Sequence, residues 1–163
     1  MLDGYGNLRS DGDRIAVRFE RQYAGTVAEI WSALTEPARV RRWLAEVVDG
    51  VIGPGETFTF RFGESEEERA FCRVRACRPP HLLELDWKVG QEDPSVVRFE
   101  LSEVNGGTLL VVDHRRLPPV GASGYSAGWH AYLRTLADFD SAAWDARFAA
   151  VLPAYRAQQA ALT

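Results

Sequence analysis

The sequence has no long apolar run, no basic tract and very few cysteines. None of its 163 residues belongs to an apolar stretch long enough to span a membrane, and the polar, acidic N-terminus lacks the apolar core of a secretory signal. We therefore expect a cytoplasmic protein without a membrane span. The net charge of -4 and the lack of an arginine-rich run argue against a nucleic-acid partner.

The two cysteines, Cys72 and Cys77, lie five positions apart in one strand-like segment. Side chains alternate between the two faces of a strand, so an odd separation places these thiols on opposite faces. We expect no disulfide between them, and both thiols are expected to be reduced, as in other cytosolic proteins.

Histidine is scarce as well. The three histidines are His81, His114 and His130, and no two of them share a ligand spacing on one predicted element. A structural zinc site needs about four ligands, whereas the sheet face that carries His114 adds only Cys72. No nucleophile motif or glycine-rich phosphate loop follows a strand. We expect neither a metal nor another cofactor.

Hydrophobic periodicity divides the chain into three parts. Residues 1–13 carry glycine, aspartate and asparagine without periodicity, which predicts a flexible tail. Residues 14–140 predict one domain, in which a strand, two short helices, about six further strands and a long helix follow one another. Residues 141–163 predict an amphipathic helical extension.

The order of these elements favours an α+β fold. Consecutive strands joined by short turns predict an antiparallel meander, and Asn105-Gly106 is a strong hairpin turn. The acidic stretch 64–68 is interpreted as a solvated hairpin tip rather than a cation site. The long helix over 125–139 is predicted to cover one face of a curved sheet.

Strand register predicts what each sheet face carries. Placing Asp86 opposite Arg98 gives a solvent-facing row of alternating charge whose ion pairs contribute little to function or stability. This row consists of Arg73, Asp86, Arg98 and Asp113. The opposite face is then apolar and meets the long helix, so that Trp129 and Trp87 look into the same space as His114. Gly128 is expected to bring the helix close to the sheet.

The extension carries a stripe of large apolar side chains, too apolar to remain in water. The stripe consists of Trp144, Phe148, Leu152 and Tyr155. Two surfaces are open to it: the chain's own domain near the two short helices, or a second copy of the chain in an isologous dimer. Pro153 allows the stretch to bend back, which favours packing on the same chain.

Four short motifs in the same order resemble one family. They are the segments 35–44 (TEPARVRRWL), 78–87 (RPPHLLELDW), 106–114 (GGTLLVVDH) and 128–136 (GWHAYLRTL). The chain is thereby similar to the homologues of the activator of the heat-shock-protein-90 ATPase, within the helix-grip superfamily of START domains and polyketide cyclases. The resemblance spans residues 14–140.

The resemblance implies a seven-stranded sheet that grips a C-terminal helix, with a cavity between them. A hydrophobic small-molecule ligand is the partner that fits such a cavity best, because the inner face carries few ionisable groups. The candidate lining residues are Trp43, Phe60, Cys72, Trp87, Phe99, Val112, His114, Trp129 and Leu133. The aromatic residues among them fit a plain packed core as well as a ligand site.

Two other functions fit the same sequence. A cyclase- or hydrolase-like enzyme would use His114 with a nearby hydroxyl or carboxylate, although a histidine held only by structural hydrogen bonds fits the same position. A protein-interaction module would bind a chaperone or another protein through the sheet or the C-terminal extension.

Overall fold

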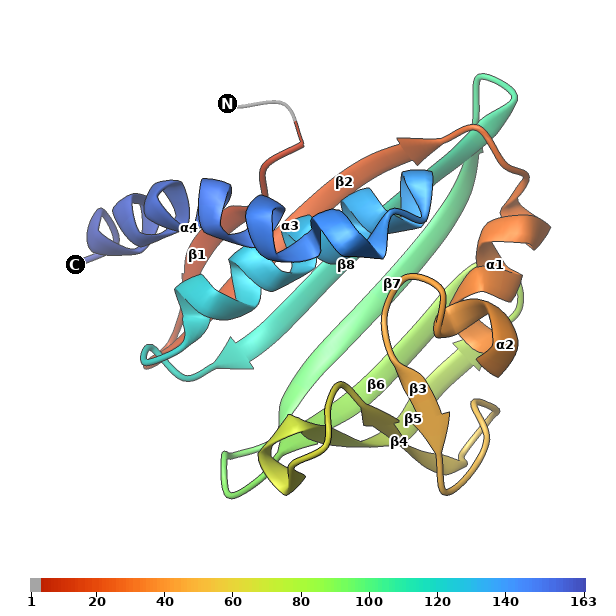
Figure 1. Cartoon of the computed structure of the whole chain (residues 1–163), viewed down its shortest axis with the longest axis horizontal. Coiled ribbons are helices and arrows are strands. Elements are labelled where there is room, and N and C mark those ends of the chain that lie inside the picture. The colour runs from red at the N-terminus through yellow and green to blue at the C-terminus, as the bar shows by residue number, and fades with distance from the viewer. Residues whose placement is uncertain (1–3) are drawn as a thin grey trace.

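The computed structural model describes residues 4–163 and contains an eight-stranded antiparallel sheet with two long helices on one face. Figure 1 shows α3 lying across the sheet and α4 running back alongside α3. The strands are β1 (Asn7–Asp11), β2 (Arg14–Tyr23), β3 (Glu46–Val48), β4 (Thr57–Arg61), β5 (Arg69–Arg78), β6 (Leu82–Val89), β7 (Ser95–Val104) and β8 (Gly107–Leu117). The helices are α1 (Val27–Thr35), α2 (Pro37–Val40), α3 (Ala122–Asp138) and α4 (Trp144–Ala160), with short 3-10 turns η1 (Glu66–Glu68) and η2 (Ser141–Ala143).

The sheet has the order β1-β2-β8-β7-β6-β5-β4-β3, so each strand from β3 to β8 pairs with its neighbour in the sequence. The predicted α+β helix-grip fold is confirmed. Local sequence determines where its elements begin and turn. Thr26 and Glu29 form a complete capping box at the N-terminus of α1. Asn105 and Gly106 both have positive φ, which matches the twist of the β7–β8 hairpin.

The N-terminal segment is more ordered than the sequence predicts. Residues 7–11 form the edge strand β1, which pairs with β2 across a turn at Gly12, where φ is +63°. The prediction of a flexible tail is therefore wrong over these residues. Strand β1 is the eighth strand, in addition to the seven that were expected. The strand was missed because Leu8 is its only buried side chain, too little for a visible alternation. Residues 1–3 lie outside the described part of the chain.

The two faces of the sheet are as predicted, but the register between β6 and β7 is shifted by two residues. Arg98 lies opposite Glu84 rather than Asp86, while Arg73 does pair with Asp86 and Arg98 with Asp113. The predicted register would have placed Glu84 opposite Glu100, and like charges directly opposite are destabilising. In the observed register Glu84 accepts from Arg98 at 3.0 Å instead.

A β-bulge in β5 changes the placement of the cysteines. The register shifts between Val74 and Ala76, so Cys72 pairs with Trp87 and Cys77 with Leu83, on the same face. The expected opposite faces are therefore wrong. Both cysteines are nevertheless free thiols.

Helix α4 packs on α3 and β1 rather than near α1 and α2. Tyr155 is fully buried, and its hydroxyl accepts from the backbone N–H of Gly6 at 2.8 Å. Gln158 accepts from the N–H of Leu8 and donates to the carbonyl of Gly6. The apolar stripe thus packs on the same chain, at a different place from the one predicted, with Tyr155 buried and Trp144, Phe148 and Leu152 partly buried.

Among the described residues, no helix combines the length and the apolar composition required to cross a membrane.

Candidate functional site

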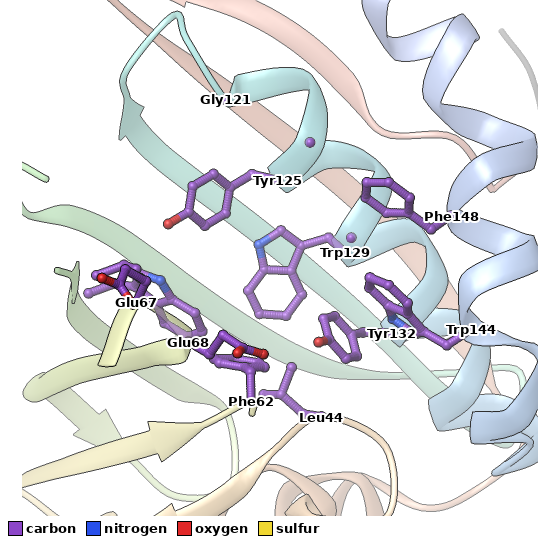
Figure 2. Close-up of a pocket in the computed structure, with 14 residues that line it drawn as sticks. Leu44, Phe62, Glu67, Glu68, Gly121, Tyr125, Trp129, Tyr132, Trp144 and Phe148 are labelled. Atoms are coloured by element: carbon purple, nitrogen blue, oxygen red, sulfur yellow. The ribbon is translucent and has the colours of Figure 1, made fainter. Parts of the chain in front are cut away.

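An aromatic cavity of about 380 Å³ lies between α3, α4 and the β4–β5 hairpin. Figure 2 shows its walls: α3 and α4 on one side, the hairpin on the other. Half of the fourteen lining residues are aromatic. They are Phe62, Trp87, Tyr125, Trp129, Tyr132, Trp144 and Phe148. We refer to this space as the aromatic cavity.

Helix α3 forms one wall of the cavity, because its aromatic residues recur at helical spacing. Tyr125, Trp129 and Tyr132 are four and three positions apart, so their side chains lie on one face of the helix. Gly124 and Gly128 leave room on that wall: a Cβ at Gly124 would meet no atom within 4 Å, and one at Gly128 would meet only Trp144, at 4.0 Å. Gly128 therefore faces α4 and the cavity, and the expectation that it brings α3 close to the sheet is wrong.

Helix α4 supplies the adjoining wall. Trp144 and Phe148 are stacked, with ring centroids 5.2 Å apart and planes inclined by 18°. The rings of Trp144 and Tyr132 are also in contact, with centroids 5.0 Å apart, and this contact joins the α4 wall to α3. The aromatic stripe of the C-terminal extension thus contributes to the cavity as well as to the packing of the helix.

The sheet and the β4–β5 hairpin close the far side. Phe62 contacts both Trp87 and Tyr132, each with ring centroids 5.8 Å apart. Beyond Phe62 the chain turns through η1, and the side chains of Glu67 and Glu68 line the cavity from there (Figure 2). The acidic hairpin tip, expected to be merely solvated, therefore lies at the rim of the cavity.

The hydroxyl groups of Tyr125 and Tyr132 stay protonated and neutral across the physiological pH range. Burial, with Glu92 beside it, raises the pKa of Tyr125, whose hydroxyl donates to Glu92 at 3.1 Å. Burial, with the charge of Asp145, raises the pKa of Tyr132 to about 12. Both phenols offer hydroxyl groups to the cavity, and neither supplies a charge.

Two indole N–H groups at the cavity have no acceptor. Nε1 of Trp87 and Nε1 of Trp144 are both buried and make no hydrogen bond. The Trp87 N–H is near enough to the Tyr125 hydroxyl to oppose part of the rise in its pKa, but it does not reach hydrogen-bond geometry. A buried donor without an acceptor costs roughly 1–3 kcal/mol.

His114 lies behind this wall and is fully buried. The Trp129 indole donates to Nδ1 of His114 at 2.9 Å, so the ring proton resides on Nε2, which faces the hydroxyl of Ser95 at 2.7 Å. The Ser95 hydroxyl in turn donates to the carbonyl of Trp87. Burial lowers the pKa of His114 to about 3, so the imidazole is neutral and its tautomer is fixed.

The candidate residues from the sequence fall into two groups. Trp87 and Trp129 line the aromatic cavity. The other seven are buried in the core and do not line it. They are Trp43, Phe60, Cys72, Phe99, Val112, His114 and Leu133.

The remaining lining residues were not singled out from the sequence. Tyr132 was detectable, because it continues the helical spacing of Tyr125 and Trp129. Trp144 and Phe148 were recognised as an apolar stripe, but only the path of α4 places them at the cavity. Glu67 and Glu68 gave no signal, because a charged turn looks the same over a cavity as in open solvent.

Several solved structures resemble this chain over most of its length. CalU16 from Micromonospora echinospora has 26% sequence identity and a TM-score of 0.78, with 94% of this chain and 95% of that chain covered. The protein encoded by BPP1335 from Bordetella parapertussis has 28% identity and a TM-score of 0.68, with 91% and 87% covered. The Aha1 dimer from Colwellia psychrerythraea has 18% identity and a TM-score of 0.66, with 76% and 93% covered.

No curated protein sequence matches the chain significantly. The family described as "Activator of Hsp90 ATPase homolog 1-like protein" matches residues 24–139, which include the sheet from β3 to β8 and all of α3. The chain therefore belongs to the family of Activator of Hsp90 ATPase homolog 1-like proteins, within the START/polyketide-cyclase-like helix-grip superfamily.

Proposed function

We propose that this protein binds an apolar small molecule in the aromatic cavity. The observation that carries the proposal is the cavity itself: about 380 Å³ of space walled by seven aromatic side chains. Ligand pockets of small molecules are commonly of this size and are lined mainly by apolar and aromatic groups with a few polar ones.

The polar groups favour a ligand that carries oxygen acceptors. The free N–H groups of Trp87 and Trp144 need acceptors, and the Tyr132 hydroxyl is an additional polar contact. Trp87 and Trp129 are expected from the sequence as ligand-binding residues and also line the aromatic cavity, which supports the proposal. A fused or conjugated ring system with carbonyl, phenol or ether oxygens fits this combination.

Acid–base catalysis through His114 has less support. Both ring nitrogens face partners, Trp129 and Ser95, and neither partner is an acid or a base near neutral pH. The imidazole is also separated from the cavity, which it does not line. An enzyme with His114 as general base would need that base to reach the ligand.

A role as a protein-interaction module is likewise not favoured. The large exposed apolar residues among those described are Val51, Phe71, Val120 and Phe139, and each lies in a different segment of the chain. A binding surface for a chaperone would present such residues together.

The test is binding of the neutral fluorescent probe N-phenyl-1-naphthylamine, read from its fluorescence increase. Gly124→Leu is designed to fill the cavity without strain, because a Cβ there meets nothing within 4 Å and φ is not positive. Ala137→Leu is the matched control, on an exposed position of the same helix. We expect binding by the wild type and the control, and at least a tenfold loss in Gly124→Leu. Equal behaviour of all three proteins would refute the proposal.

A further inference from the structure

The aromatic cavity is asymmetric in charge. Its lining includes two carboxylates, those of Glu67 and Glu68, and within the described residues no lysine or arginine lines it. Aromatic faces carry a negative quadrupole that attracts a cation placed over them. Carboxylates beside such faces add to the same potential, and the charged side chains that line the cavity are all negative.

Neighbouring residues do not cancel this charge. Arg69, the cation nearest in sequence, pairs with Glu66 at 3.6 Å rather than with the two lining glutamates. Glu68 accepts from the hydroxyl of Ser65 at 2.8 Å, an interaction that fixes its position but leaves its charge. No ion pair engages Glu67 among residues 4–163.

Further carboxylates stand behind the aromatic walls. Glu92 accepts from the hydroxyl of Tyr125, and the charge of Asp145 contributes to the raised pKa of Tyr132. Glu92 and Asp145 thus place two further carboxylates next to phenols of the lining, in addition to the lining glutamates.

We infer that the ligand of this cavity is a cation: an apolar, ring-containing molecule with a protonated or quaternary amine directed toward Glu67 and Glu68. This inference rests on the proposed function, since it specifies the ligand of the same cavity. The amine gains cation–π contact with the aromatic walls and ion pairing at the η1 rim. A carboxylate-bearing ligand of the same shape meets repulsion at that rim instead.

The experiment uses three naphthyl probes of similar size that carry a positive, a neutral and a negative polar group. These are 2-naphthylmethylammonium, 2-naphthylmethanol and 2-naphthoate, with affinities measured by displacement of N-phenyl-1-naphthylamine or by calorimetry. We expect the ammonium to bind about tenfold more tightly than the alcohol, in the range of a partly desolvated cation–π and ion-pair contact, and the carboxylate to bind most weakly. The advantage of the ammonium is expected to shrink as salt is added.

Variants on one turn locate the effect. Glu67→Gln should reduce the preference for the ammonium over the alcohol at least threefold, the preference being the ratio of the two affinities measured on the same variant. Glu66→Gln is the matched control, because Glu66 lies on the same turn but pairs with Arg69 and does not line the cavity. We expect this control to retain the preference of the wild type.

The outcomes separate this inference from the proposed function. If neither the neutral dye nor any naphthyl probe binds, both are wrong. If the neutral dye binds but the ammonium has no advantage over the alcohol, the cavity binds ligands and only the charge inference is overturned. An equal loss of preference in Glu66→Gln and Glu67→Gln also overturns it, because the effect would then come from the general charge of the turn.

Discussion

The indole N–H of Trp129 donates a hydrogen bond of 2.9 Å to Nδ1 of His114 and so connects the cavity wall on α3 to the sheet behind it. Two consequences follow from this contact. It fixes the rotamer of the largest aromatic group on the α3 wall, and it requires a neutral imidazole, because a protonated His114 would present an N–H to the Trp129 donor.

The first prediction concerns the pH dependence of stability. The pKa of His114 is about 3 in the folded protein and near 6.5 when unfolded, so between these values the unfolded state binds the additional proton. Stability is therefore greatest above about pH 6.5 and falls with decreasing pH, by at most about 1.4 kcal/mol per pH unit from this group. Urea denaturation near pH 7, 6 and 5 measures the slope.

The control for this prediction is a comparison of two histidine variants. His114→Gln should be less stable near pH 7 yet show a shallower decline toward pH 5, because the group that resists protonation is gone. His81→Gln, at an exposed position, should keep the decline of the wild type. A His114→Gln slope equal to that of the wild type would contradict the account of a buried neutral imidazole.

The contact between His114 and Trp129 is also the part of the site that sequence could predict. The strand that ends at His114 and the helix that carries Trp129 were correctly placed on facing elements, because alternation and helical spacing fix which side chains point inward. The family motifs cover the same residues. What neither could supply is which inward aromatic residues border empty space, because packed and lining residues share the same pattern.

The errors have equally specific causes. The β6–β7 register was set by one charge pair, and the pairing of Glu84 with Arg98 outweighed it. The bulge in β5 inserts one residue, and no glycine or proline in that segment indicates it in the sequence. The inserted residue moves Cys77 to the same sheet face as Cys72, opposite to the expectation. Contacts of α4 with β1 join residues about 150 positions apart, which no local pattern encodes.

A second prediction concerns Gly128 on the cavity wall. Replacing it with alanine should stabilise the protein by about 1 kcal/mol, because glycine is the less favourable residue inside a helix and the new Cβ meets Trp144 at an ordinary distance of 4.0 Å. Thermal unfolding measures the gain. Gly121→Ala is the contrasting variant: φ at Gly121 is +104°, so the same substitution there should destabilise. Destabilisation by Gly128→Ala would show that the wall has no room for a methyl group.

A third prediction concerns the hydroxyl of Tyr155. It accepts from the N–H of Gly6 and shares a hydrogen bond with Nδ1 of His130, each at 2.8 Å. Tyr155→Phe leaves the buried Gly6 N–H without an acceptor, which should lower the free energy of unfolding by about 1–3 kcal/mol. Tyr125→Phe, whose hydroxyl bonds to the exposed Glu92, should cost less than half as much. Equal losses in the two variants would argue against the Tyr155 contact as the attachment of α4 to the N-terminal segment.

The last prediction concerns the free edge of the sheet. β1 is an edge strand, and the N–H groups of Leu8 and of Gly6, which directly precedes the strand, bond to side chains of α4 instead of another strand. Truncation after Asp140 removes Tyr155 and Gln158 together, so the edge regains unpaired groups that can pair with a second chain. We expect the truncated protein to melt at a lower temperature and to elute from size-exclusion chromatography in larger species as concentration rises. The double variant Tyr155→Phe/Gln158→Ala, which keeps the apolar stripe of α4, should show the same trend more weakly. If the truncated chain melts as the full chain does and remains the same size, then α4 neither stabilises the sheet nor protects its edge.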